Sequence, residues 1–165
     1  MPLLASIIVC TNIGFTAAFD TVARNPAWVA YDLEPQEVIA AKRPDIPFSP
    51  DPRAPESDNA ADYLKSGFDR GHLAPSADFN WNTNAQAQTY LFTNIAPQYP
   101  FMNRVTWRAV ESEVRQLAAS GTVHVLTAPV YEGGTNRMGR VRVPDAFVKI
   151  AWGSFGFKMW KVANR

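Results

Sequence analysis

The sequence predicts an α+β fold with a mainly antiparallel sheet. Strand-like and helix-like segments follow one another without the regular strand–helix–strand alternation of parallel α/β proteins. The chain contains 13 prolines and 9 glycines, which indicates many turns rather than a helical bundle. A length of 165 residues gives room for one domain, residues 1–165, with one core and little space for a second.

The composition is that of a globular protein and excludes several classes of site. Hydrophobic residues make up 47% of the chain and charged residues 19%, which argues against disorder. Because the net charge is only +1, affinity for nucleic acid cannot be inferred from the overall balance. Cys10 is the only cysteine, which excludes an internal disulfide and a multi-cysteine zinc site. A basic stretch indicates either a polarised surface or scattered solvated charge, and it contains Arg137, Arg140, Arg142 and Lys149.

Three strands are predicted near the start of the chain, at residues 3–9, 14–19 and 28–33. The apolar run at 2–10 has no preceding basic residue and no good cleavage site, so it is interpreted as a strand rather than a signal segment. No stretch approaches the length of a transmembrane helix. Prolines in residues 34–63 exclude a long helix and favour an ordered surface loop, with a disordered linker as the alternative.

The rest of the chain is predicted to mix short strands with helices, in this order: strand and turn at 67–75, helix at 80–88, strand at 90–95, helix at 103–120, and strands at 123–127, 141–150 and 155–162. Asn82 or Thr83 is expected to cap the first helix, and Pro97 to end the strand that follows it. The long helix is the clearest element, because apolar residues recur at helical spacing and Gly121 ends it.

The strongest chemical signal is Asp69-Arg70-Gly71-His72. A histidine that ends a strand can accept a proton from water near neutral pH. Taken alone, an isolated histidine is more often a surface or hydrogen-bonded core residue. Arg70, and Arg43 in the proline-rich loop, are candidates for contact with phosphate because a guanidinium is always charged and can bridge two phosphoryl oxygens.

A second group of polar residues lies along the predicted long helix. Asn103, Trp107, Glu111 and Arg115 follow at steps of four and are expected to share one face, with Arg115 pairing Glu111. An amide oxygen and a carboxylate suit Mg²⁺, which keeps several waters and needs few protein ligands. The alternative is a helix-capping asparagine followed by a surface Glu–Arg pair.

The remaining candidates are expected to support the site. Asp69 is interpreted as structural, either within the turn or orienting an arginine. Gly71 is expected to allow a backbone shape that brings its neighbours into one cleft. Asn94 and Gln98 are expected to hold this cleft together rather than to take part in the chemistry.

These motifs, in this order, resemble the DNA/RNA non-specific endonuclease family. The resemblance rests on the segments 68–75 and 93–98, followed by Asn103, Trp107, Glu111 and Arg115. Weaker similarity extends it over nearly the whole chain. Two departures are Ala128, where relatives commonly have glycine, and the end of the chain at Arg165, which is expected to leave a sheet edge or apolar surface uncovered.

The resemblance implies a ββα-metal (His-Me finger) fold, with a central sheet flanked by helices. His72 would be the general base, Asn103 the ligand of Mg²⁺ or its substitute Mn²⁺, and Glu111 the holder of a water on the metal. Arg43 and Arg70 would contact phosphate, and Asn94 would support His72 or the metal shell. The implied activity is cleavage of DNA and RNA with little sequence preference, leaving 5′-phosphate ends. The implied setting is secreted, periplasmic or delivered into other cells, with an inhibitor or immunity protein and a dimer as further expectations and no membrane partner.

Two other interpretations stay open at this point. In the first interpretation, the chain is a degenerate relative that binds nucleic acid or a partner protein without cutting. A binding module, however, has no need of His72, Asn103 and Glu111 together. Alternatively, the same chemistry would serve a nutritional nuclease or a toxin, and no residue distinguishes these two roles.

Overall fold

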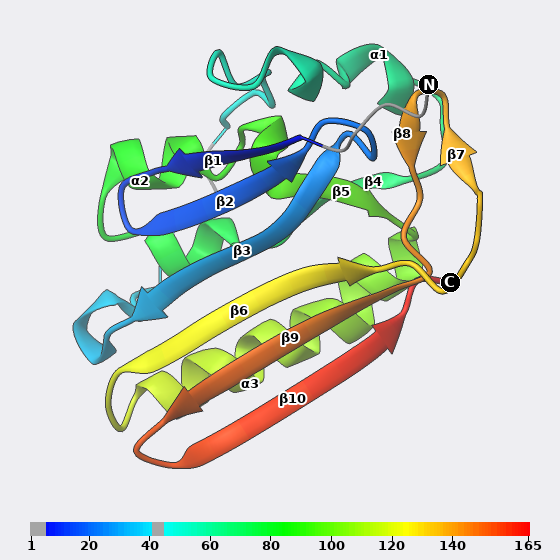
Figure 1. Ribbon diagram of the computed structural model, residues 1–165. Coiled ribbons are helices and arrows are strands. Elements are labelled where there is room, and N and C mark those ends of the chain that lie inside the picture. The colour runs from blue at the N-terminus through cyan, green and yellow to red at the C-terminus, as the bar shows by residue number, and fades with distance from the viewer. Residues whose placement is uncertain (1–5, 41–44) are drawn as a thin grey trace.

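The computed structural model describes residues 6–40 and 45–165. Arg43 and the first residues of the strand predicted at 3–9 lie outside the described residues. A six-stranded antiparallel sheet forms the centre of the fold, in the order β1-β2-β3-β6-β9-β10 (Figure 1). Its strands are β1 (Ile7–Thr11), β2 (Phe15–Asp20), β3 (Asn25–Leu33), β6 (Val123–Val130), β9 (Ala146–Gly153) and β10 (Gly156–Ala163).

Two short antiparallel pairs accompany this sheet, β4 with β5 and β7 with β8. The bounds of these strands are β4 (Asp69–His72), β5 (Ile95–Gln98), β7 (Arg137–Met138) and β8 (Val141–Arg142). The α-helices are α1 (Ala60–Tyr63), α2 (Thr83–Gln88) and α3 (Arg108–Ala118), with a π-helical turn at Met102–Trp107 directly before α3. Short 3₁₀ turns lie at Pro35–Glu37, Pro55–Ser57, Ser76–Phe79 and Phe92–Asn94. The mainly antiparallel α+β architecture predicted from the sequence is confirmed.

The main core lies between the sheet and α3, which runs behind β6, β9 and β10 in Figure 1. Val114 and Ala118 of α3 belong to this core together with Phe147 and Ala151 of β9. Successive strand residues point to opposite faces, so the residues between these inward positions lie on the outer face. There Trp152 of β9 is partly exposed and Phe157 of β10 is 65% exposed.

Several predicted elements are confirmed. Asn82 caps α2, because its side-chain oxygen accepts hydrogen bonds from the backbone N–H groups of Asn84 and Ala85. The predicted long helix corresponds to the π-helical turn followed by α3. The described part of residues 34–63 is an ordered loop with short helical turns, as predicted. None of the helices within 6–40 and 45–165 is long and apolar enough to span a membrane.

The strand predicted at 90–95 is wrong. Residues 92–94 form a 3₁₀ turn, because the Asn94 side chain hydrogen bonds to the backbone of Thr89 and Ala74 and folds the chain back. The strand in this region is β5, and it contains Pro97 instead of ending before it. Proline is tolerated here because β5 pairs only with β4, so its other edge needs no ladder hydrogen bond.

The strand predicted at 141–150 is interrupted. Pro144 cannot donate a backbone hydrogen bond, and the chain turns between β8 and β9 at this point. The side-chain amide of Asn164 donates to the Pro144 carbonyl over 2.9 Å and to the Pro97 carbonyl over 3.1 Å. One residue near the end of the chain therefore ties this turn to β5.

The packing of α3 on the sheet predicts a large loss of stability on substitution of Phe147. Its ring is fully buried and lies 5.7 Å from the Trp107 ring. We expect Phe147→Ala to lower the free energy of unfolding by about 3–5 kcal/mol, measured by urea denaturation. Phe157→Ala, at an exposed aromatic on the neighbouring strand, should change it by less than about 0.5 kcal/mol. Equal effects of the two substitutions would contradict this account of the core.

Candidate functional site

A cleft of about 420 Å³ brings together most of the residues predicted to carry chemistry. It lies between the end of β4 and the exposed side of the π-helical turn and α3. The predicted residues that line it are Arg70, His72, Asn103, Glu111 and Arg115. Lining residues that were not predicted are Pro75, Ser76, Ala77, Asn80, Gln86, Tyr90, Arg104 and Arg108. Asp69, Gly71, Asn94 and Gln98 do not line the cleft but lie directly around it.

His72 is the last residue of β4 and is half-buried at the cleft wall. Its ring packs edge-on against Tyr90, with the ring centres 4.9 Å apart, and lies 5.5 Å from the Phe48 ring. The indole N–H of Trp107 donates to the His72 carbonyl over 3.3 Å. Ring packing on one side and a backbone hydrogen bond on the other restrict the orientation of the imidazole.

Asn94 fixes the chain immediately after His72. Its side chain accepts from the Ala74 N–H and donates to the Ala74 carbonyl, both over 2.9 Å, and its backbone carbonyl accepts from the Leu73 N–H. Asn94 is fully buried, and its side chain contacts the backbone that follows His72.

Asp69 orients the amide of Asn103. A carboxylate oxygen of Asp69 accepts from the Asn103 side chain over 2.9 Å, and the same carboxylate accepts twice from Arg104, over 2.7 and 2.8 Å. An ionised carboxylate can only accept, so the amide presents its NH₂ group to Asp69. The amide oxygen of Asn103 is thereby left for another ligand. Of the two alternatives predicted for Asp69, the structure shows the contact with an arginine, and its structural role stays a prediction.

The π-helical turn explains why Asn103 and Arg108 both reach the cleft. In a π-helical turn the backbone hydrogen bonds join residues five positions apart, which widens the turn. Side chains five positions apart therefore point in more similar directions than they do in an α-helix. Asn103 and Arg108 are five apart, and both line the cleft. The steps of four predicted from the sequence describe α3, where Glu111 and Arg115 line the cleft, but they do not describe the turn before it.

Arg115 pairs with Asp78 and not with Glu111, which corrects the prediction. The Arg115 guanidinium donates to one Asp78 carboxylate oxygen over 2.8 Å, and the Tyr31 hydroxyl donates to the other over 2.7 Å. Asp78 is fully buried, so an unpaired charge there would be costly, and it takes the arginine for this reason.

Glu111 lies beneath the cleft with a strongly shifted pKa. Burial raises the pKa of Glu111 to about 7, against the positive charges of Lys149, Arg115 and Arg108, and the negative charge of Asp78 raises it further. Burial likewise lowers the pKa of Lys149 to about 8, opposed by the charges of Glu111 and Asp78. A carboxylic acid poised near neutral pH at a cleft wall is typical of a functional site.

The prediction that Lys149 belongs to a basic stretch of solvated charge is wrong, because Lys149 is fully buried on β9. The available signal was strand alternation, which puts Lys149 on the same face as Phe147 and Ala151. The charge of Lys149 favours a surface position, but in the structure its ammonium lies in the interior and bonds to polar groups there.

Gly71 is required for space rather than for an unusual backbone shape. It lies within β4 with an ordinary extended conformation, so the conformational reason predicted for it is wrong. A Cβ atom at Gly71 would lie 2.1 Å from Cδ of Gln98, whose side chain crosses it and is fully buried. Gln98 thus lies directly against β4 behind the cleft, and its role in holding the cleft together stays a prediction.

Arg70 is exposed at the cleft and is held by aromatic rings. Its guanidinium carbon lies 5.5 Å from the ring centres of both Phe48 and Tyr63. Cation–π contacts leave the N–H groups of a guanidinium able to bind an anion. With Arg104, Arg108 and Arg115 also lining the cleft, its charge favours anionic ligands.

Comparison with known proteins gives one consistent family. The model of the DNA/RNA non-specific endonuclease family matches residues 6–164. A nuclease of Nostoc sp. is 38% identical over 127 residues, which cover 74% of this chain and 46% of the relative. Human mitochondrial endonuclease G is 32% identical over 152 residues, covering 82% of this chain and 51% of the relative. The chain therefore spans about half the length of these curated relatives.

The fold is also similar to a solved structure. In a crystal structure of an EndoG/EndoGI complex, a chain superposes with a TM-score of 0.83 at 25% identity, covering all of this chain and 76% of that one. The similarity supports the predicted fold over its full length. Several of the relatives are named as mitochondrial nucleases, so the resemblance does not by itself favour secretion.

The shifted pKa of Glu111 predicts a pH-dependent stability. The folded protein holds this proton up to about pH 7, whereas the ordinary pKa is 4.5, so raising the pH through this window lowers the free energy of unfolding. Glu111→Gln removes the effect. We therefore expect the parent to lose stability relative to Glu111→Gln on going from pH 5 to pH 8, measured by urea unfolding in EDTA.

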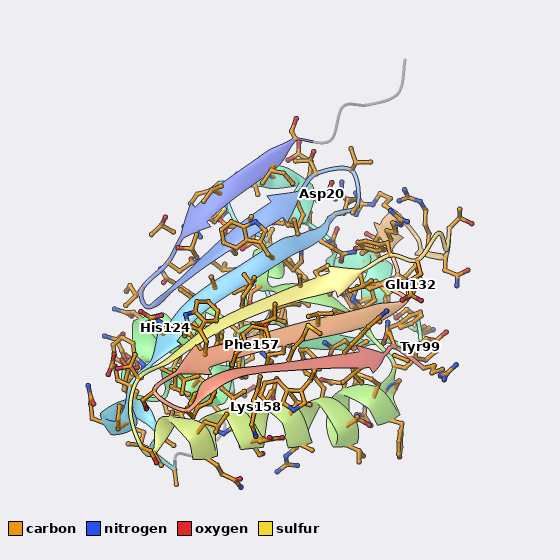
Figure 2. All side chains as sticks on the ribbon, turned by 60° about the horizontal axis from the view of Figure 1, so that its bottom comes forward. Asp20, Tyr99, His124, Glu132, Phe157 and Lys158 are labelled. Atoms are coloured by element: carbon orange, nitrogen blue, oxygen red, sulfur yellow. The ribbon has the colours of Figure 1, made fainter. Side chains whose placement is uncertain are left out.

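The control for this experiment is on the same helix. Glu113 is partly exposed, and its pKa is lowered by a hydrogen bond from Lys158. Figure 2 labels Lys158, on β10. The difference in free energy of unfolding between the parent and Glu113→Gln should therefore stay constant from pH 5 to pH 8. A difference between parent and Glu111→Gln that does not change with pH would show that Glu111 ionises normally.

Proposed function

Because the chain belongs to the DNA/RNA non-specific endonuclease family, we propose that it hydrolyses phosphodiester bonds of DNA and RNA in the cleft beside His72. The observation that carries the proposal is the meeting of His72, Asn103 and Glu111 in one cleft with four arginines. A phosphodiester attacked by water needs a proton acceptor, a cation beside the leaving oxygen, and positive charge on the phosphoryl oxygens. Each of these has a candidate at this cleft.

His72 is proposed as the general base. It accepts a proton from the attacking water, and the packing of its ring against Tyr90 and Phe48 keeps it directed at the cleft. The described arginines are proposed to neutralise the phosphoryl oxygens, with Arg70 on the β4 side and Arg104 and Arg108 on the helix side. A role for Arg43 in phosphate contact stays a prediction.

Asn103 is proposed as the ligand of one Mg²⁺, with Mn²⁺ as a possible substitute. Its amide oxygen faces away from Asp69 for the reason given above, which suits a hard cation. No group of three or more His, Cys, Asp or Glu side chains within the described ranges could hold a metal, so the donor set fits an ion that keeps most of its waters. Glu111 is proposed to accept a hydrogen bond from that hydration shell. When bound, the ion supplies Lewis-acid stabilisation of the charge on the phosphate and leaving oxygen.

Contacts through phosphate carry no base information, so the proposed enzyme has little sequence preference. We also propose 5′-phosphate ends. An inhibitor protein is a proposed partner, since the similar solved structure is of an EndoG/EndoGI complex and concerns the inhibition of EndoG. The alternative function, a binding module that does not cut, is disfavoured because binding alone does not need a base held as His72 is.

The first test is cleavage of supercoiled plasmid and of RNA, with and without EDTA. We expect the parent to cleave both in Mg²⁺ and to stop in EDTA. His72→Ala should cleave at least about 100-fold more slowly, because a positioned base contributes roughly 10²–10⁴ in rate. His124→Ala is the matched control: it removes the other histidine of the chain, which lies on β6 (Figure 2), and should cleave like the parent. A His72→Ala variant as active as the parent would remove the proposed base.

The second test concerns the metal. We expect Asn103→Ala to raise the Mg²⁺ concentration that gives half-maximal cleavage by about tenfold or more, because a direct ligand is lost. Binding of an oligonucleotide in EDTA should change much less. Asn84→Ala, at an exposed asparagine of α2, serves as the control. An unchanged Mg²⁺ titration for Asn103→Ala would exclude Asn103 as a ligand.

A further inference from the structure

Lys149 is a buried cation that the proposed chemistry does not use. Its side chain is fully buried among core residues on the inner face of β9. Taking an ammonium out of water costs several kcal/mol, and an apolar side chain between Phe147 and Ala151 would fill the same layer without that cost. Packing therefore does not explain a lysine at this position.

The contacts of Lys149 lead to the segment that carries His72. The ammonium donates to the Leu73 carbonyl over 3.1 Å and to the Thr127 hydroxyl over 2.6 Å. It also lies 5.0 Å from the centre of the Trp107 ring. An ammonium has three N–H donors. Two of them are used in these hydrogen bonds, and the positive charge faces an aromatic ring.

Three consecutive residues at the end of β4 are thus held by side chains from three other elements. The His72 carbonyl is bonded by Trp107, the Leu73 carbonyl by Lys149, and both backbone groups of Ala74 by Asn94. Lys149 holds the carbonyl and Asn94 the N–H of the same peptide, the one between Leu73 and Ala74, and a rotation of this peptide would displace Leu73 and with it the neighbouring His72 ring. Lys149 is the only one of the three side chains that bonds the Leu73 carbonyl in the described structure.

We propose that Lys149 is a positioning residue of the candidate active site: by holding the Leu73 carbonyl, it fixes the direction of the His72 imidazole. The proposal rests on the proposed function insofar as His72 is the base. Its structural content, that removal of the Lys149 ammonium reorients the His72 ring, holds without any cleavage. The positive charge also opposes the effect of burial on Glu111, so the same side chain acts on two of the groups that line the cleft.

The test measures the histidine rings directly. The chain has two histidines, so a ring nitrogen NMR spectrum contains two sets of signals, and His124 on β6 is an internal reference. In Lys149→Met, which keeps an unbranched apolar side chain of similar length, we expect the His72 signals to shift or broaden while those of His124 stay in place. Lys161→Met, at an exposed lysine of β10, is the matched control and should leave both sets unchanged.

The kinetic arm uses the same variants. We expect Lys149→Met to lower kcat by about 100-fold with KM within about threefold, because the base is misdirected while phosphate contacts remain. Lys149→Gln, which keeps a donor but not the charge, should recover part of kcat and move the His72 signals less. Equal losses in the Met and Gln variants with unmoved His72 signals would overturn the proposal in favour of a purely electrostatic role.

Two further outcomes decide the proposal. Parent-like kcat and His72 signals in a Lys149→Met protein that unfolds cooperatively would overturn it. If Lys149→Met does not fold, Lys149→Gln decides: it lacks the ammonium that bonds the Leu73 carbonyl, and parent-like kcat with unmoved His72 signals in that variant would overturn the proposal. If the parent does not cleave, the proposed function fails, while a selective shift of His72 in Lys149→Met still supports the positioning role.

Discussion

The burial of charge between the sheet and α3 is the constraint on which the rest of this structure depends. Asp78, Glu111, Arg115 and Lys149 lie close enough to shift one another's pKa. Two are acidic and two basic, so each desolvated charge has an opposite neighbour, and Asp78 is satisfied fully by Arg115 and Tyr31. Glu111 has no such ion pair in the described structure and responds by holding its proton to near neutral pH. The packing that stabilises α3 and the chemistry available at the cleft therefore have the same origin.

A short unit of two strands and a helix supplies the functional groups above this layer. β4 ends at His72, β5 pairs back along it from Ile95 to Gln98, and the chain then enters the π-helical turn that carries Asn103. The carboxylate of Asp69, at the start of β4, reaches the same turn and bonds both Asn103 and Arg104. The two sides of the cleft are thus joined by a charge-assisted contact as well as by the chain.

The sequence was sufficient for features that depend on local rules. The cap at Asn82, a long helix that ends shortly before Gly121 and the meeting of His72, Asn103 and Glu111 at one cleft follow from residue types and their spacing. It was insufficient where a distant partner decides the outcome. Arg115 has Glu111 within reach on its own helix, but the buried Asp78, 37 residues away, binds it. Lys149 looked like a surface charge because nothing near it in sequence reveals the Leu73 carbonyl and the Thr127 hydroxyl. The π-helical turn was also missed, since a period of 3.6 residues does not describe it.

The contact between Gly71 and Gln98 makes two positions far apart in the chain behave as one. A side chain of any size at 71 meets the Gln98 amide, and a residue at 98 that is longer or stiffer has no other space, because Gln98 is fully buried. Sequence variation at these two sites is therefore coupled, and a change at 71 is accommodated only after a smaller residue has been installed at 98. In a library that randomises the loop and strand around His72, the order in which substitutions are introduced would then decide which variants survive.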